Sequence, residues 1–288
     1  MSDTLSRFIF ENAPIRGETV RLQSTWNAVL ERHDYPPLLL GILGELMAAS
    51  ALLTATLKLN GSMIMQIQGN GPVSLLVVEC QGDMSLRATA KWEGEQLQGT
   101  LQDLVGDGRF VITLDPRDGK QAYQGIVPLE GDSVAEILQN YMTRSEQLET
   151  RLWLTANDDT AAGMLLQKLP DQPEQDADAW NRACQLADTV KPAELRMDTE
   201  TLLHRLFNEE DLRLFDPQPV TFHCGCSREG VSRVLRMLGK EEVRSILEER
   251  GKIEVHCEFC NQRYTFDPID TEQVFATDIA TPGSETRH

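Results

Sequence analysis

The segment Cys224-Gly225-Cys226 is followed, after residues 227–256, by the segment Cys257-Glu258-Phe259-Cys260. Zn²⁺ prefers four ligands at the corners of a tetrahedron, with Zn–S bonds of about 2.3 Å. Each short pair can supply one edge of that tetrahedron, so the intervening chain only has to bring the two edges together. The spacing therefore predicts that Cys224, Cys226, Cys257 and Cys260 bind one metal ion. Four thiolates fill every corner and leave no open position for a hydrolytic water.

The first pair is unusual for a zinc site, because zinc ribbons normally repeat the C-x-x-C spacing. A disulfide across a single residue would close a tight, strained ring, and strained disulfides are the labile, regulatory kind. The residues alone therefore leave two interpretations open, an inert structural zinc and a redox-sensing site. His223 and His256 each flank a cysteine and are alternative ligands, although with four sulfurs available we expect them to point away.

The composition restricts the class of partner. The 288 residues carry 27 Lys and Arg against 45 Asp and Glu, a formal net charge of −18. Such an acidic chain repels phosphate backbones, so a zinc finger that binds nucleic acid is disfavoured. The start, Met1 to Thr4, lacks the basic and apolar regions of a secretory signal. Without export, we expect the paired cysteines to bind metal or to react with oxidants rather than to form a disulfide framework.

One stretch, residues 38–57, is long enough to span a membrane. It carries Glu45 near its centre together with several hydroxyl side chains, which are costly in a bilayer. We expect a buried core helix and no membrane association.

The first 170 residues are predicted to form an α+β domain with a mostly antiparallel sheet, because strands and helices occur in blocks rather than in strict alternation. Ser24 and Ser133 are placed as helix N-caps, the latter with Glu136 completing a capping box. Gly69-Asn70-Gly71 is interpreted as a hairpin turn rather than a phosphate loop, since no helix follows it. The expected strands are 7–11, 15–22, 62–68, 73–80, 84–91, 108–114, 121–129, 151–156 and 163–169, and the expected helices are 25–33, 37–58 and 133–144.

Residues 171–218 differ in composition, with 12 acidic and 5 basic side chains. Two helices are predicted there, 179–190 and 199–208, with Thr199 as the N-cap of the second. The second has one apolar face, the linker stripe, which consists of Leu202, Leu203, Leu206 and Phe207. Helices with such thin apolar stripes are marginally stable alone and need to dock on a neighbour. An ordinary inter-domain linker and a segment that can be released from its docking surface both fit these features.

Residues 219–288 are predicted to be a small zinc-binding domain. Ser227 is placed to cap a helix over 228–238, with an incomplete capping box that suggests a late start. A helix over 240–249, strands 253–256 and 263–266, and a polar tail follow. This module has too little apolar mass for a self-sufficient core, so metal binding should supply much of its folding free energy.

These motifs resemble the bacterial 33 kDa chaperonin family, redox-regulated heat-shock holdases. The resemblance rests on Cys224 to Glu229 followed by Cys257 to Cys260 and Tyr264. It extends upstream to Arg144-Ser145-Glu146-Gln147-Leu148, to Gly69-Asn70-Gly71-Pro72 and to the segment from Leu52 to Lys58, and so covers nearly the whole chain.

The resemblance implies a cytoplasmic chaperone that is inactive and monomeric while reduced and bound to one Zn²⁺. Oxidants such as peroxide with heat, or hypochlorous acid, would form the disulfides Cys224–Cys226 and Cys257–Cys260 and expel the zinc. The zinc domain and the linker would then unfold, and the protein would dimerise and hold unfolding clients without ATP. The linker stripe is a candidate for contact with these clients, a hypothesis that rests on its hydrophobic periodicity. It implies three parts: a client-binding and dimerising domain at 1–170, a redox-sensitive linker at 171–218 and the redox switch at 219–288.

Three alternatives remain. Cys257 and Cys260 have the spacing of a thiol–disulfide oxidoreductase, but such motifs open a helix after a strand. An inert structural zinc protein and a zinc-dependent nucleic-acid binder are the others. No Ser/His/Asp or paired-carboxylate constellation indicates an enzyme. Of the remaining cysteines, Cys80 should be buried, and Cys184 in the linker could form an off-pathway disulfide after oxidation.

Overall fold

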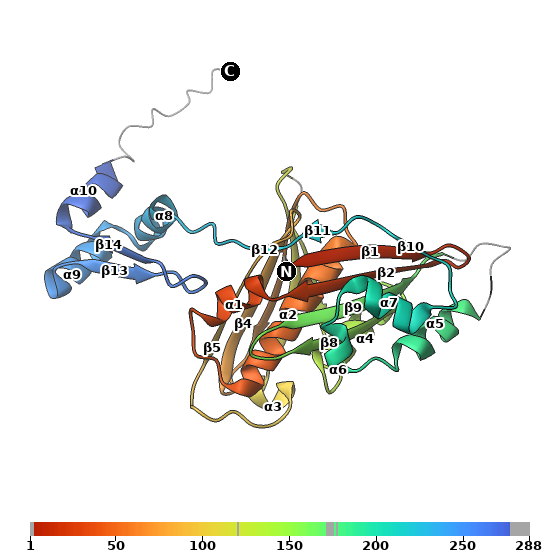
Figure 1. The fold of residues 1–288 in the computed structure, drawn as a ribbon. Coiled ribbons are helices and arrows are strands. Elements are labelled where there is room, and N and C mark those ends of the chain that lie inside the picture. Colours follow the sequence, from red (N-terminus) through yellow and green to blue (C-terminus); the bar gives the residue numbers. More distant parts are fainter. Residues whose placement is uncertain (1–2, 120, 171–175, 177, 277–288) are drawn as a thin grey trace, which may run out of the picture. The chain divides into compact units, whose positions relative to one another are not determined.

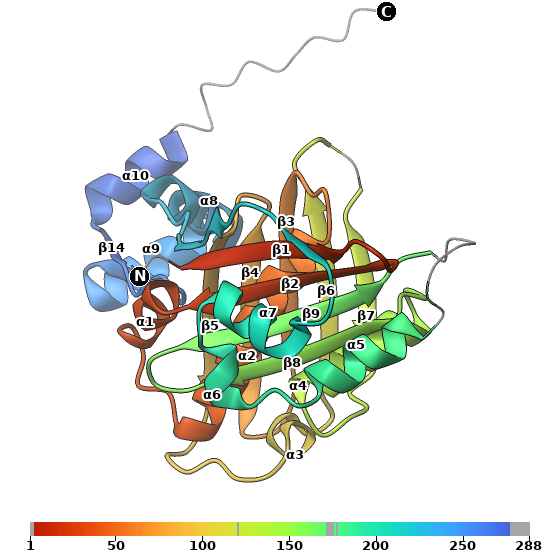
Figure 2. The ribbon, with the colours of Figure 1, turned by 45° about the vertical axis from the view of Figure 1, so that its right-hand side comes forward.

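A computed structural model describes residues 3–119, 121–170, 176 and 178–276. The chain divides into two compact units, Met1–His223 and Cys224–His288. The first unit contains two sheets with a long helix between them, as Figures 1 and 2 show. The second is a small unit with a two-stranded sheet and three helices in its described part. The predicted α+β class is confirmed.

Sheet A has the strand order β10-β1-β2-β9-β8, with β11 also pairing with β1, and all its pairs are antiparallel. The neighbours β2 and β9 pair from Ile15 opposite Lys168 to Leu22 opposite Ala161, which fixes the face that each side chain occupies. The strands are β1 (Thr4–Phe10), β2 (Ile15–Leu22), β8 (Thr150–Ala156), β9 (Ala161–Lys168), β10 (Leu212–Leu214) and β11 (Gln218–Pro219).

Sheet B has the strand order β12-β5-β4-β3-β6-β7, antiparallel except for the parallel pair of β12 and β5. Gly69 closes the hairpin between β3 and β4 through its N–H to the Ser74 carbonyl, at 3.2 Å, which confirms the plain turn. The strands are β3 (Gly61–Gln68), β4 (Val73–Gln81), β5 (Ser85–Trp92), β6 (Arg109–Pro116), β7 (Tyr123–Val127) and β12 (Thr221–Phe222).

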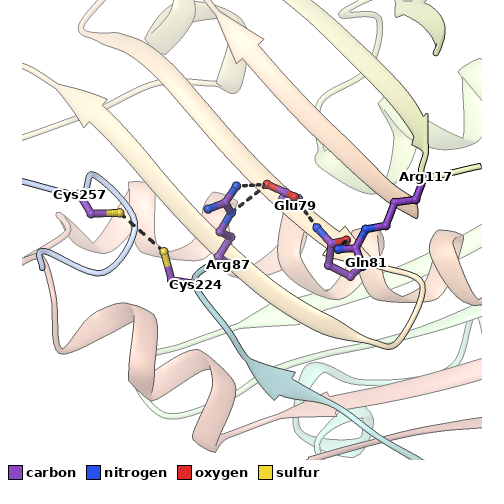
Figure 3. A network of polar contacts seen from close by, with 6 residues as sticks. All are labelled: Glu79, Gln81, Arg87, Arg117, Cys224 and Cys257. Carbon is purple, nitrogen blue, oxygen red and sulfur yellow. Dashed lines mark hydrogen bonds and ion pairs between the residues drawn. The ribbon is translucent and has the colours of Figure 1, made fainter. Parts of the chain in front are cut away.

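The outward face of sheet B carries polar side chains that bond across strands (Figure 3). Glu79 of β4 accepts a hydrogen bond from Arg87 Nε of β5 at 2.8 Å and one from Gln81 at 2.5 Å. Arg117 donates in turn to Gln81 at 2.7 Å. Such cross-strand pairs are typical of a solvent-facing sheet surface.

Helix α2 (Pro37–Ala55) packs against strands of both sheets and forms the centre of the larger core. It has the length and hydropathy of a membrane span, but 67% of the relevant window is buried inside the protein. Its helix–sheet contacts account for the apolar residues on most of its faces, and the predicted core helix is confirmed. Burial raises the pKa of Glu45 on this helix to about 7.

At the start of helix α1 (Ser24–Leu30), the prediction of Ser24 as the N-cap is wrong. Ser24 is the first helical residue and Gln23 precedes it without a capping side chain. Instead, the Asp3 carboxylate accepts hydrogen bonds from the N–H groups of Gln23, Ser24 and Thr25, at 2.6 to 3.0 Å. A carboxylate from a distant part of the chain thus satisfies the free N–H groups at this helix start, which local sequence could not reveal.

Helix α3 (Leu101–Val105) contacts β4 of sheet B, whereas helix α4 (Val134–Arg144) packs mainly against β8 of sheet A and also contacts β7 of sheet B. The first was not predicted, although Thr100 and Asp103 form a capping box. Ser133 caps α4 as predicted, accepting from the Glu136 N–H at 3.2 Å. The Glu136 side chain bonds the Asp132 N–H rather than that of Ser133, so the predicted capping box is displaced by one residue.

Helices α5 (Ala179–Ala187), α6 (Pro192–Leu195) and α7 (Thr199–Phe207) cover the face of sheet A opposite α2 (Figure 2). Helix α6 was not predicted, since its four residues carry no period. The N-cap of α7 is Asp198, whose carboxylate accepts from the Thr201 N–H at 2.9 Å. Thr199 was therefore wrongly assigned as the cap, and its hydroxyl instead lies 2.9 Å from that of Thr19 on β2.

The second unit contains α8 (Arg228–Leu238), α9 (Lys240–Arg250), β13 (Ile253–His256), β14 (Arg263–Phe266) and α10 (Pro268–Ala276). Ser227 caps α8 through the Gly230 N–H at 3.1 Å, so the helix starts at Arg228 and not later as expected. Helix α10 lies where the sequence suggested a polar tail; the tail beyond 276 is outside the described residues.

Candidate metal centre

The first cysteine pair lies between β12 and α8. Cys224 and Cys226 precede Ser227, whose side chain fixes the first turn of α8. The N-terminal end of a helix carries a partial positive charge, which favours negatively charged sulfur nearby. Capping by Ser227 therefore holds the start of the helix directly beside the pair.

The second pair lies in the turn that joins β13 to β14. The Cys257 N–H donates to the Gln262 carbonyl at 3.0 Å, and the Asn261 N–H donates to the Cys257 carbonyl at 2.8 Å. Asn261 adopts a left-handed conformation with φ of 57°, which asparagine tolerates better than most residues. This knuckle points Cys257 and Cys260 toward the same space.

The four sulfurs converge. Cys224 Sγ lies 3.6 Å from Cys257 Sγ (Figure 3), and Cys226 Sγ lies 3.3 Å from Cys260 Sγ. All four lie within 4.8 Å of one another. A tetrahedron with Zn–S bonds of about 2.3 Å has S–S edges of about 3.8 Å, so the spacing suits a metal ion of this size. These four cysteines could hold a metal ion.

The predicted histidine alternatives do not enter this group. In the described part of the chain, the cluster of potential ligands around these sulfurs consists of the four cysteines, without His223 or His256. A complete set of sulfur donors leaves no position for imidazole.

Without a cation, the surroundings of the second pair favour the protonated thiols. Burial raises the pKa of Cys260 to about 12 and also raises that of Cys257. The Tyr264 hydroxyl donates to Cys226 Sγ at 3.1 Å, and this bond raises the tyrosine pKa to about 12. Four thiolates so close together repel one another, and a bound cation is what would make them stable. Tyr264 is a neighbour that orients one ligand, as partners of metal ligands commonly do.

The core of the second unit is thin, as predicted. Among the described residues of this unit, the buried apolar side chains of the core are Leu235, Val243, Ile253, Phe266 and Val274. Arg228 covers the ring of Phe266 at 4.2 Å from the centroid and donates to the Thr265 carbonyl at 2.8 Å. So few buried side chains provide little hydrophobic stabilisation for a separate unit.

The linker stripe is buried within the first unit. Leu202, Leu203, Leu206 and Phe207 are 1–6% exposed and pack against sheet A. Phe207 meets Phe10 edge-to-face, with ring centroids 5.3 Å apart. The expectation that these helices dock on a neighbour is confirmed. Contact of the stripe with client proteins remains a prediction.

Polar contacts that the sequence did not reveal also hold the linker. Asp188, just beyond α5, accepts hydrogen bonds from Arg151 and from Trp153 Nε1 on β8, both at 3.0 Å. Within the linker, Arg182 pairs with Glu210 at 2.6 Å. Only the folded chain brings these charges together, because they lie 28 to 37 residues apart.

The two remaining cysteines are separate from the cluster. Cys80 is fully buried, as predicted, and burial raises its pKa to about 12. Cys184 is half-buried on α5, and burial raises its pKa to about 11. Both thiols are therefore poor nucleophiles in this conformation.

The structure also bears on the oxidoreductase alternative. Cys257 follows one short strand and Cys260 precedes another, so neither opens a helix. Redox-active C-x-x-C motifs gain their reactivity from a helix N-terminus, which is missing at this described turn.

Comparison with known proteins agrees with this architecture. The family described as Hsp33 protein matches residues 3–267. A 33 kDa chaperonin of Methylobacillus flagellatus is 58% identical, with 100% of this chain and 99% of that protein covered. A 33 kDa chaperonin of Chromobacterium violaceum is 50% identical, with coverages of 99% and 98%.

The crystal structure of the 33 kDa chaperonin from Thermotoga maritima has the same fold. It matches with a TM-score of 0.80 at 21% identity, over 96% of this chain and 99% of that one. The family match spans both units, and the two relatives align over nearly their whole length. The chain therefore belongs to the Hsp33 family.

Proposed function

We propose that this protein is a redox-regulated, ATP-independent holdase chaperone. Membership of the family of 33 kDa chaperonins supports a chaperone role. The finer proposal assigns client binding and dimerisation to residues 1–170, the releasable linker to 171–218 and the redox switch to 219–288. The observation that carries the switch is the convergence of four cysteine sulfurs within 4.8 Å in a unit with a thin core.

In the reduced state, Cys224, Cys226, Cys257 and Cys260 hold one zinc ion. Bound zinc would supply the positive charge that keeps four sulfurs deprotonated and the binding free energy that folds this unit. Tyr264 donates a hydrogen bond to Cys226 and so orients that sulfur. The site has no free corner for substrate, and this fits a binding protein rather than an enzyme.

Oxidation removes the ligands. Each disulfide forms when two thiolates give up two electrons, and one molecule of peroxide with two protons accepts them and becomes two waters. The proposed pairs are Cys224–Cys226 and Cys257–Cys260, which follow the family resemblance. The short sulfur contacts of the reduced site run across the pairs instead, so proximity alone does not decide the pairing. Disulfide sulfurs bind zinc poorly, and the unit would lose the metal that folds it.

The linker is the second part of the switch. Its helices bury an apolar face against Phe8, Phe10, Ile15, Met164 and Leu166 of sheet A. The chain after α7 is held by the two- and three-residue strands β10, β11 and β12 before it reaches Cys224. When the second unit unfolds, these short strands lose an ordered continuation. Undocking would expose the linker stripe and the face of sheet A, which together offer apolar surface to unfolded clients.

The proposed partners are unfolded client proteins and, after oxidation, a second copy of the chain. The reduced protein would be a monomer, and both forms would act in the cytoplasm. Neither a membrane nor a specific nucleic acid is a proposed partner, since a net charge of −18 opposes binding to phosphate backbones.

The test is light scattering of a heat-unfolding client with either the reduced, zinc-loaded protein or the protein oxidised by warm peroxide. Zinc released during oxidation is measured with a chromogenic chelator, and the disulfides are mapped by mass spectrometry. Suppression of aggregation by the oxidised sample alone, with about one zinc lost per chain, supports the switch. If zinc stays bound and both samples act alike, the cluster is a structural zinc site.

A further inference from the structure

A second apolar site lies in the first unit, away from the linker. A cavity of about 110 Å³ opens where sheet B meets the ends of α2 and α4. Its apolar lining comes from Leu53, Leu57, Met63, Ile112, Leu114, Met142 and Leu148, and its polar lining from Arg16, Thr56, Tyr123, Tyr141 and Glu146. None of these residues belongs to the linker helices.

The size of the cavity limits its ligand. Pockets for drug-sized molecules or cofactors usually have volumes of roughly 300–1,000 Å³. An engineered cavity of about 150 Å³ accommodates benzene. A cavity of about 110 Å³ therefore suits one aliphatic or small aromatic side chain.

The cavity lies beside an unprotected sheet edge. Strand β7 ends sheet B, and no strand in the described part of the chain pairs with its outer side. Its sequence, Tyr-Gln-Gly-Ile-Val, contains neither charge nor proline. Natural proteins usually protect exposed edges with lysine or proline, so an edge without them is suited to pairing with another strand.

The register of sheet B directs an added strand toward the cavity. Met63, Leu114 and Tyr123 lie opposite one another on β3, β6 and β7, and all three line the cavity. A strand added beyond β7 would continue this row, because side chains opposite each other share a face. Every second side chain of that strand would lie on the face of Tyr123, beside the opening.

The wall of the cavity is held in place. The hydroxyls of Tyr123 and Tyr141 both donate to Glu146 Oε1, at 3.1 and 2.5 Å. A side chain at position 125 would displace this arrangement, because its Cβ would lie 2.0 Å from the Tyr141 hydroxyl. Gly125 and Glu146 thus keep Tyr123 against the cavity while it remains 51% exposed.

Exposed apolar side chains surround this place. Among the described residues, ten large apolar side chains are exposed, and four of them are Leu57, Tyr123, Ile126 and Leu148. Leu57, Tyr123 and Leu148 line the cavity, whereas Ile126 lies on the opposite face of β7. An edge strand with apolar groups on both faces can contact alternate side chains of a partner on each side.

We propose that the outer edge of β7 and this cavity form a binding site for an extended, uncharged polypeptide segment. The segment pairs with β7 through its backbone and places one aliphatic or aromatic side chain in the cavity, a mode of recognition known as strand addition. This inference rests on the proposed function, because its ligand is a segment of an unfolded client. It differs in using a surface that the linker leaves uncovered, so a single short segment should bind without oxidation. Holding a whole client would still need the larger apolar surface that undocking of the linker exposes.

The test uses fluorescence anisotropy with the full-length protein and a fluorescein-labelled nonapeptide of alternating leucine and threonine. One comparison peptide has serine in place of leucine, and another carries N-methyl groups at alternate backbone nitrogens. The variants Leu148→Lys and Ile126→Lys introduce charge at the cavity and at the edge, and both positions are exposed enough to keep the fold. Met237→Lys, at an 80% exposed position of the second unit, is the matched control.

The leucine peptide should bind the reduced and oxidised proteins with comparable affinity. Both comparison peptides should bind at least about tenfold more weakly, because the serine peptide lacks the apolar side chain for the cavity and the N-methylated peptide lacks the backbone N–H groups that pair with β7. Leu148→Lys and Ile126→Lys should weaken binding by a similar factor, with Met237→Lys unchanged. If both variants bind the leucine peptide with unchanged affinity, the inference is overturned. So does a loss of self-association in Ile126→Lys without an effect on the peptide, because β7 would then pair with a second copy.

The two proposals can fail separately. If oxidised protein suppresses aggregation but neither substitution alters peptide binding, only the strand-addition site is refuted. If peptide binding behaves as expected but oxidation does not activate the chaperone, only the redox switch is refuted.

Discussion

Replacing Phe207 by alanine should release the linker without any oxidant. The side chain is 2% exposed, and its ring contacts Phe10 edge-to-face at 5.3 Å and Phe8 at 6.3 Å. It lies near the end of α7, a helix of 9 residues that depends on docking for its stability.

Truncation of a buried phenylalanine to alanine costs about 3–5 kcal/mol. If the linker opens independently of the rest of the first unit, the whole loss acts on the docking equilibrium. The lower value, about 3 kcal/mol, increases the opening equilibrium constant by roughly a hundredfold. This change is large against the stability that a few short helices can have on their own.

The assay is native-state hydrogen exchange of the reduced, zinc-loaded protein, followed by mass spectrometry of the peptides from α5 to α7. Their exchange should accelerate by roughly a hundredfold, while peptides from α2 keep their protection. His204→Ala, on the exposed face of the same helix, is the matched control. In a light-scattering assay, Phe207→Ala should show partial chaperone activity without peroxide and with zinc still bound. Unchanged exchange in α5–α7, or equal acceleration throughout the first unit, would refute the idea that the linker opens on its own.

Three further predictions follow from named contacts. Removing zinc with a chelator should abolish exchange protection in α8–α10 while tryptophan fluorescence stays constant, because all four tryptophans lie in the first unit. A simultaneous change in exchange and in fluorescence would contradict the idea that the second unit unfolds independently of the first. Asp188→Asn should accelerate hydrogen exchange in the linker only a few-fold, because the ion pair of Asp188 with Arg151 is about half exposed and such pairs contribute about 0–1 kcal/mol. An acceleration as large as that of Phe207→Ala would show that polar contacts dominate the docking of the linker. Burial raises the pKa of Glu18 from its ordinary value of 4.5 to about 7, so the folded state binds more protons than the unfolded state between these values. The free energy of unfolding should therefore fall as pH rises from about 4.5 to 7, with a contribution from Glu18 on the order of 3 kcal/mol at most and a similar one from Glu45, whose pKa burial also raises to about 7. In urea titrations Glu18→Gln should make this dependence shallower and leave the part due to Glu45; an equally steep profile in the variant would exclude a contribution from Glu18.

The sequence by itself determined most elements and the four cysteines that could hold a metal ion. Alternating apolar residues and turn glycines located the hairpins of sheet B, and a continuous apolar run located α2. These signals are local, because the period of a strand or helix is written in neighbouring residues. The cysteine spacing was equally local, since two short chelating pairs need only be brought together by the fold.

Only the tertiary structure decided the contacts between distant segments. The cap of α1 comes from Asp3, and the linker is held by Phe10 and by the pairing of Asp188 with Arg151. The short strands β10 to β12 exist because sheet edges are available for pairing, and their own sequences carry no strand period. The same holds for the cavity beside β7, whose walls come from six elements and from the segments that follow α2 and α4. Such features depend on which surfaces contact one another in the folded chain, and the local sequence pattern does not specify these tertiary contacts.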